Sequence, residues 1–218
     1  MSDNPPDEIK GTLVVGTFLT LDGVMQAPGS LDEDRDGGFQ HGGWMAKYGD
    51  EKTGEIVDSQ FAEADALLLG RKTYEIFASY WPNVEAENNF LASKLNSMPK
   101  YVASRTLDAA EWNNSTLLSG DVVTAVEDLK KERRDIILVQ GSANLIQTLL
   151  AHDLIDEFRL WIFPLILGDG KRLFGDGTMP ANLELTSAET SSTGVQILQY
   201  DRAGEIEYGV VGSGDRAE

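Results

Sequence analysis

The chain has 218 residues, of which 41% are hydrophobic and 8% aromatic, so it has enough apolar side chains for a hydrophobic core, and extensive disorder is not expected. Its formal net charge of -18 would repel nucleic acids and anionic membrane surfaces, which argues against both as partners. The lack of cysteine excludes disulfides and thiolate chemistry, and with only two histidines no structural zinc site is expected.

The N-terminal segment MSDNPPDEIK is polar and acidic, with neither the basic start nor the apolar stretch of a signal peptide. No run in the sequence approaches the roughly 18 apolar residues of a membrane span. We therefore expect a cytoplasmic protein with one domain over residues 11–212, between flexible tails at residues 1–10 and 213–218. A salt-adapted protein and an ordinary soluble protein with a well-hydrated surface would both have this acidic composition.

The first part of the domain has strands that alternate with helices. A run of β-branched residues at 12–20 predicts a buried strand, which the turn signal Asp22-Gly23 ends. Residues 24–49 are glycine-rich and irregular, and such a long loop inside a compact domain is usually functional. Apolar residues at helical spacing predict a helix over residues 50–64. Further strands and helices are expected at residues 66–69, 71–80, 100–104, 121–133, 136–140 and 142–152.

This alternation predicts a largely parallel sheet with helices on both faces. From residue 156 the pattern becomes rich in strands. Residues 157–167 predict one long strand, and residues 183–191 and 195–202 predict a hairpin around residues 192–194. We expect these last strands to extend one edge of the sheet in antiparallel fashion.

Two strand-to-helix junctions share one design. In ALLLGRKTYE the strand ends at Gly70, and residues 71–73 form the first helical turn, where free N–H groups and the helix dipole favour an anion. In IILVQGSANLI the strand ends at Gly141, and Ser142 stands at the position of a helix N-cap. Neither is a G-x-G-x-x-G fingerprint or a P-loop, so each alone is also consistent with an ordinary turn. Together with a third junction at residues 102–106, they place hydroxyls and a guanidinium at the carboxyl edge of the sheet, where α/β folds bind ligands.

Four motifs taken together resemble one superfamily. LLLGRKTYE, KYVASRT, ILVQGSANLI and DEFRLWIFPLILGDGKRLF, in this order and at these intervals, resemble the dihydrofolate-reductase superfamily, and in particular the reductase domain of bifunctional riboflavin-pathway deaminase/reductases. LDGVMQAPG and GGFQHGGW resemble the stand-alone relatives of that domain. The resemblance implies an α/β fold of three layers, with a mostly parallel eight-stranded sheet and an antiparallel C-terminal hairpin. It also implies NADPH as the hydride donor.

The resemblance assigns cofactor contacts to particular residues. It implies that Ser104 and Arg105 meet the adenosine end of the cofactor, where an arginine beside the 2′-phosphate selects NADPH over NADH. Asp22 and Gly23 would flank the nicotinamide. The implied contacts to the two sides of the pyrophosphate are Gly70, Arg71 and Thr73, and Gly141, Ser142, Ala143, Asn144 and Leu145.

The proton donor is the point at which the chain departs from dihydrofolate reductases. These enzymes carry an acidic residue on the helix before the Gly-Arg strand end, and the family's spacing places Gly54 there. Asp50 lies on the same predicted helix face as the apolar side chains, so it is one candidate, although it also suits an N-cap. His41, in the long loop, is a second candidate because histidine transfers protons near neutral pH, and a structural role suits it as well. An ordered water is the third.

Trp44 and Tyr48, in or next to the long loop, are candidates for a flat substrate pocket, because aromatic rings offer planar heterocycles a large contact area. The acidic run at residues 32–37 matches the first half of an EF-hand loop. Gly43, however, stands at its twelfth position, where calcium needs a glutamate, so no metal site is expected.

The sequence therefore predicts an NADPH-dependent oxidoreductase that reduces a C=N or C=O bond of a small substrate. The substrate would be a planar or sugar-bearing heterocycle, such as a pterin, a pyrimidine or a riboflavin precursor, or another carbonyl compound. A ribose-phosphate substrate would need a second basic cluster, for which Lys171 and Arg172 are the obvious source. Two alternatives remain open: a non-catalytic nucleotide-binding or regulatory protein, and an interaction protein whose C-terminal third forms a homodimer. We expect residues 24–49 to act as a lid.

Overall fold

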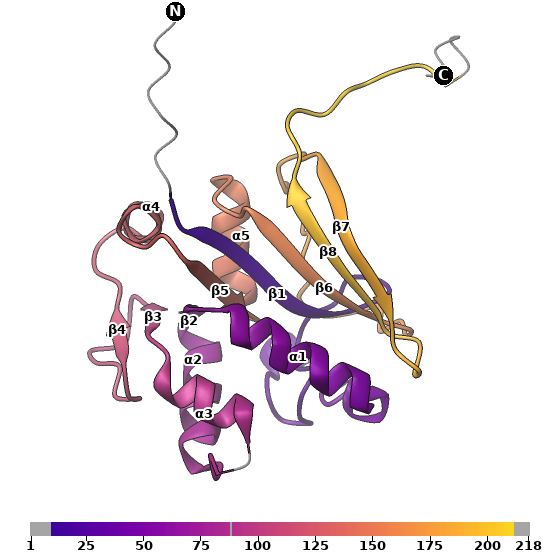
Figure 1. Cartoon of the computed structure of the whole chain (residues 1–218). Coiled ribbons are helices and arrows are strands. Elements are labelled where there is room, and N and C mark those ends of the chain that lie inside the picture. The colour runs from indigo at the N-terminus through magenta and orange to yellow at the C-terminus, as the bar shows by residue number, and fades with distance from the viewer. Residues whose placement is uncertain (1–9, 88, 212–218) are drawn as a thin grey trace, which may run out of the picture.

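The computed structural model describes residues 10–87 and 89–211 of the chain. The tails predicted at residues 1–10 and 213–218 lie outside these ranges, apart from Lys10. Within the described ranges, one sheet of eight strands forms the centre of the molecule, in the order β4-β3-β2-β5-β1-β6-β8-β7 (Figure 1). None of the helices in this part of the chain combines the length and the apolar character that are needed to cross a bilayer.

Parallel strands make up most of the sheet. They are β1 (Thr12–Thr20), β2 (Ala66–Gly70), β3 (Lys100–Ala103), β4 (Ser115–Leu117), β5 (Ile136–Gln140) and β6 (Glu157–Phe163). β7 (Leu183–Thr190) and β8 (Gln196–Arg202) form an antiparallel hairpin, and β8 pairs with β6, also antiparallel. The predicted mostly parallel sheet with an antiparallel C-terminal hairpin is therefore confirmed.

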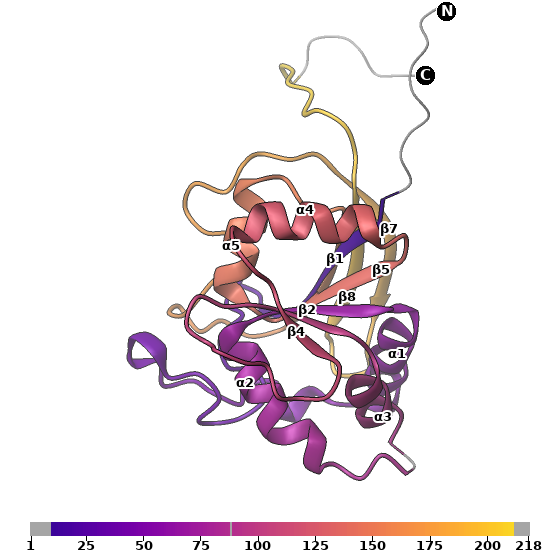
Figure 2. The same cartoon turned by 90° about the vertical axis from the view of Figure 1, so that its left-hand side faces the viewer.

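Helices cover both faces of the sheet, which gives the three layers seen in Figure 2. α4 and α5 pack on one face, where Leu129 and Leu149 enter the core. α1, α2 and α3 pack on the other face, where Phe61, Tyr74 and Leu95 are buried. The α-helices are α1 (Glu51–Glu63), α2 (Arg71–Tyr80), α3 (Phe90–Ser97), α4 (Val122–Glu132) and α5 (Ala143–Ala151), and short 3-10 helices lie at Asp36–Gly38, Ala46–Tyr48 and Trp81–Asn83.

The central strands are buried on both sides because they are apolar at consecutive positions. Leu67 and Leu69 of β2 enter the core below α1 and α2, and Leu68 between them enters the opposite core. Successive side chains of a strand point to opposite faces, so only an uninterrupted apolar run can fill both cores. The central strands thereby form a rigid base for the turns that follow them.

Two features of the fold differ from the sequence prediction. β6 ends at Phe163 rather than at Leu167, because its neighbour β1 ends opposite Phe163 and Pro164 has no N–H group to continue the ladder. α3 and β4 were not predicted. β4 has three residues, which is too short for a period-two pattern to be recognised.

Candidate functional site

The turns after β2 and β5 lie side by side at the carboxyl edge of the sheet, because these two strands are neighbours. Two hydrogen bonds join them. The Gly70 N–H donates to Ser142 Oγ at 3.0 Å, and the Ser142 N–H donates to Thr73 Oγ1 at 3.0 Å. The two junctions that the sequence analysis singled out separately are therefore one structural unit.

Ser142 has a different role from the one predicted. It does stand at the N-cap position of α5, but its side chain makes no capping hydrogen bond. Its backbone is left-handed, with φ of 63°, and the preceding Gly141 has φ of 57°. This conformation turns the hydroxyl toward Gly70 and away from the first turn of α5. A non-glycine residue held in this region is strained, and such strain is concentrated at functional sites.

The α-helices of the described residues begin in two different ways. Side chains of Asp50, Asn89 and Asp121 accept hydrogen bonds from first-turn N–H groups and so cap α1, α3 and α4. α2 and α5 begin at Gly70 and Ser142 with no side-chain cap. Their first-turn N–H groups stay available at the positive ends of two helix dipoles, an arrangement that favours an anion.

The third junction follows β3, which pairs with β2 so that Ala103 lies opposite Gly70. Ser104 Oγ accepts hydrogen bonds from the Thr106 and Leu107 N–H groups at 3.1 and 3.0 Å, which fixes this turn. Arg105 is exposed, and within the described residues its side chain has no hydrogen bond or ion pair. It is therefore available to an anionic ligand.

The end of β1 is held by Asp22. Its carboxylate accepts hydrogen bonds from Thr20 Oγ1 at 2.6 Å and from two N–H groups at residues 167–168, and it pairs with Arg172 at 3.1 Å. Burial alone would raise the pKa of Asp22, but these hydrogen bonds outweigh it and hold the pKa well below its usual range. Asp22 is thus an ionised anchor. That it and Gly23 flank a nicotinamide stays a prediction.

Comparisons with known proteins identify the family. The model of the RibD C-terminal domain matches residues 12–197. The chain belongs to the RibD C-terminal domain family. It is 35% identical to the uncharacterized protein YyaP of Bacillus subtilis over 140 residues, which are 63% of this chain and 74% of YyaP.

Among the solved structures that share the fold of this chain, two are informative. One is described as a riboflavin biosynthesis protein of Shewanella sp. PV-4, with a TM-score of 0.66 and 23% identity over 88% of this chain and 99% of that one. The other is dihydrofolate reductase from Enterococcus faecalis complexed with NADP(H), with a TM-score of 0.56 and 13% identity over 89% of this chain and 98% of that one. The predicted dihydrofolate-reductase-like fold is confirmed.

The long loop of this RibD C-terminal domain, residues 24–49, is organised by the buried side chain of Gln26. Its Nε2 donates to the carbonyl oxygens of Asp34 and Asp36 at 3.1 and 3.0 Å, and its Oε1 accepts from the Lys171 N–H at 3.0 Å. Trp44 Nε1 donates to the Gln26 carbonyl at 2.8 Å. Gln26 thus ties both halves of the loop to the segment after β6, through its side chain and its carbonyl group.

A four-residue ion cluster connects the loop tip to the uncapped helix α2. Asp34 pairs with Lys72 at 2.9 Å and with Lys171 at 2.7 Å, and Asp36 pairs with the same two lysines. Hydrogen bonds from Lys171 and then Lys72 lower the pKa of Asp36 to about 2. This cluster could not be predicted from the sequence, since its members are far apart in the chain. Lys72 and Lys171 are therefore already neutralised by the two aspartates of this cluster, and Arg172 is neutralised by Asp22.

Trp44 and Tyr48 are brought together, but they are packed into the core. Both are buried, and their rings meet the Phe163 ring edge-on at centroid distances of 5.2 and 5.5 Å. This aromatic cluster also includes Trp161. A role in binding a planar substrate stays a prediction, and in this conformation the two rings belong to the core.

The two candidate proton donors are in very different settings. Asp50 caps α1, and its carboxylate also accepts two hydrogen bonds from Ser192, at 2.9 and 2.6 Å. The Ser192 hydroxyl and the Thr53 N–H lower the pKa of Asp50 to about 2. His41 is exposed, with its ring edge-on to Phe39 at 5.6 Å. In the described residues no cluster of three or more histidine, aspartate or glutamate side chains is arranged to hold a metal ion.

Proposed function

We propose that this RibD C-terminal domain is an NADPH-dependent reductase that acts on a C=N or C=O bond of a small substrate. The substrate would be a pterin, a pyrimidine, a riboflavin precursor or a related planar or sugar-bearing heterocycle, or another carbonyl compound. The observation that carries the proposal is the pair of neighbouring helices, α2 and α5, that begin without side-chain caps. The shared fold of a dihydrofolate reductase complexed with NADP(H) supports it.

The residues at this edge fit the phosphates of a dinucleotide. In a protein with a net charge of -18, an anion needs local donors, and two helix N-termini provide them without any net charge. Gly70, Arg71 and Thr73 would hold one side of the pyrophosphate, and residues 141–145 the other. A side chain at Gly141 would be strained by the φ of 57°, so this turn favours glycine. When bound, NADPH would supply the hydride.

Arg105 would select the 2′-phosphate. Arg71 is already engaged by Glu75 through two hydrogen bonds of 3.0 Å, and Lys72 by the ion cluster, whereas Arg105 is exposed and unpaired within the described residues. A guanidinium in this position can form charge-assisted hydrogen bonds to a phosphate that NADH lacks.

We favour His41 over Asp50 as the proton donor. Asp50, with a pKa of about 2, is ionised at neutral pH, and its oxygens already accept hydrogen bonds from α1 and Ser192. His41 is on the same loop as the ion cluster, and its ring contacts Phe39. Phe39 packs close to Gly170, in the segment after β6. We therefore assign proton delivery to His41 or to a water that it orients.

Cofactor titration tests the binding part of the proposal. The wild type should bind NADPH about tenfold more tightly than NADH, and Arg105→Ala should abolish the difference. Arg134→Ala is the matched control, because Arg134 is also exposed but precedes β5 at the opposite edge of the sheet. Equal affinity of the wild type for both cofactors, or equal effects of the two substitutions, would contradict the assignment.

Turnover tests the chemical part. With a substrate found in a panel of pterins, pyrimidines and carbonyl compounds, His41→Ala should lower kcat by about 100-fold and leave the NADPH dissociation constant unchanged. NADPH binding without oxidation by any member of the panel would favour a nucleotide-binding regulatory protein. Two observations favour this second function. The Asp50 carboxylate is already occupied as the cap of α1, and glycine stands at position 54, where dihydrofolate reductases have an acidic residue.

A further inference from the structure

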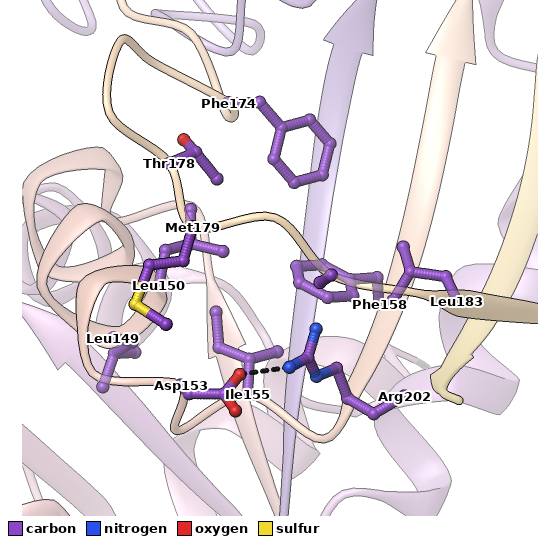
Figure 3. A pocket seen from close by; sticks show the side chains of 11 residues that line it. Leu149, Leu150, Asp153, Ile155, Phe158, Phe174, Thr178, Met179, Leu183 and Arg202 are labelled. Atoms are coloured by element: carbon purple, nitrogen blue, oxygen red, sulfur yellow. Dashed lines mark hydrogen bonds and ion pairs between the residues drawn. The ribbon is translucent and has the colours of Figure 1, made fainter. Parts of the chain in front are cut away.

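A cavity lies at the opposite edge of the sheet from the uncapped helices. It has a volume of about 210 Å³ and lies between the end of α5, the start of β6, the segment before β7 and the end of β8 (Figure 3). None of its lining residues belongs to the strand-to-helix turns or to the long loop. The proposed cofactor site leaves this cavity without a role.

The lining is mostly apolar. Leu149, Ile155 and Phe158 form its inner wall and are buried, while Phe174 and Met179 at its mouth are 47% and 48% exposed. A closed apolar cavity of about 150 Å³ can hold a benzene molecule. A cavity of about 210 Å³ therefore has room for a six-membered ring with a short substituent. The half-exposed side chains at its mouth leave an entry path.

One charged pair stands among these apolar side chains. Arg202, at the end of β8, donates a hydrogen bond to Asp153, which follows α5, and Figure 3 shows the two groups facing each other at the cavity. A guanidinium has five N–H donors. Within the described residues, the Asp153 bond is the single hydrogen bond of the Arg202 side chain. Arg202 thus presents further donors to a ligand in the cavity.

Asp153 is a partner that an incoming group can replace. Its side chain is 55% exposed, whereas that of Arg202 is 28% exposed. An exposed ion pair of this kind contributes little to stability. A ligand carboxylate could therefore displace Asp153 from Arg202. The weak, exposed ion pair would be replaced by a hydrogen-bonded pair between Arg202 and the ligand, next to the apolar lining of the cavity.

We propose that this cavity is a binding site for a compact apolar carboxylate, such as an aromatic acid with a ring of six atoms. The ring would occupy the space between Phe158, Phe174 and Met179, and the carboxylate would pair with Arg202. The net charge of -18 opposes an anion, but at physiological salt charges more than about 8 Å apart are largely screened. The ligand carboxylate then gains a net attraction by displacing Asp153 from Arg202 or by binding the guanidinium donors that Asp153 leaves free.

The test compares phenylacetate with 2-phenylethanol, which has the same ring and linker but no charge. Titrations followed by amide chemical shifts, at 0.15 M salt and without nucleotide, should give at least tenfold tighter binding of the acid. The shifts should lie at residues 149–155 and 174–179. Arg202→Met should remove the preference for the acid.

Asp153→Asn is the matched variant, and it should tighten binding of the acid several-fold, because it removes the competing carboxylate. Asp153 has φ of 52°, a conformation that asparagine accepts, so this variant should fold normally. Leu150→Phe, which fills the cavity, should weaken both ligands.

Several results would overturn the proposal. These are equal affinity for the acid and the alcohol, no binding of the acid at millimolar concentration, unchanged affinity in both charge variants, or shifts centred on the turns after β2 and β5. Because no nucleotide is present, a failed NADPH titration would leave this result intact, and the reverse also holds.

Discussion

The amino and carboxyl edges of the sheet differ in how their polar groups are hydrogen-bonded. At the amino edge, cationic side chains satisfy backbone oxygens inside the protein. Lys100 donates to the carbonyls of Leu95 and Met98, and Lys130 to that of Leu154. At the carboxyl edge, the first turns of α2 and α5 have no side-chain cap, and ion pairs connect separate loops. Backbone oxygens at the amino edge are thus satisfied within the protein, whereas first-turn N–H groups at the carboxyl edge stay available for a dinucleotide.

The largest expected effect concerns the loops that the carboxyl edge must hold in place. At Gly170, φ is 119°, and an added Cβ would lie 2.7 Å from Val24 and 2.8 Å from Phe39. Gly170→Ala should therefore lower the free energy of unfolding by about 3 kcal/mol. Gly168→Ala, with φ of 79° and open space around it, should cost about 1 kcal/mol. Chemical denaturation of the two variants measures the difference, and equal costs would mean that the loop is not tightly packed.

The second effect tests the amino edge. Lys100 is fully buried, and burial lowers its pKa from 10.5 to about 8. Between these values the unfolded chain holds a proton that the folded chain has released, so stability rises with pH. Relative to Lys100→Met, the wild type should gain on the order of 2 kcal/mol between pH 8 and 10.5. Urea unfolding across this range measures the gain, and a constant difference would mean that the hydrogen bonds to Leu95 and Met98 offset the effect of burial on the pKa.

The third effect contrasts capped and uncapped helices directly. Asp121 accepts hydrogen bonds from the Val123 and Thr124 N–H groups, so Asp121→Ala should cost about 1 kcal/mol of stability and leave NADPH affinity unchanged. Ser142→Ala removes the acceptor of the Gly70 N–H and should weaken NADPH binding by several-fold. If both variants changed affinity equally, the difference between the two kinds of helix start would have no functional meaning.

The smallest effect concerns the ion cluster. The double variant Asp34→Asn, Asp36→Asn should reduce stability by less than about 1 kcal/mol, because its lysine partners are partly exposed. Amide exchange in residues 24–49 should nevertheless become faster, since the loop tip loses its attachment to Lys72 and Lys171. In the wild type the pairing should persist at pH 4 and be lost as the pH falls through about 2, the pKa of Asp36. Unchanged exchange in the variant would contradict this attachment.

The fold was largely predictable because its signals are local. The apolar run that ends at Gly70 and the cap of α1 at Asp50 each depend on residues that are close together in the sequence. The contacts that shape the candidate site are not local. Gln26 meets Lys171, and Ser142 meets Gly70, only because the topology brings distant segments together. The left-handed backbone of Ser142, which prevents it from capping α5, has no sequence signature of its own.

Amide chemical shifts during NADPH titration test the central claim most directly. The largest shifts should fall on the first turns of α2, at residues 71–73, and of α5, at residues 143–145. The capped first turns of α1 and α4 should change little. Shifts that are absent from both uncapped turns at saturating NADPH, or that are centred on the capped helices, would contradict this claim.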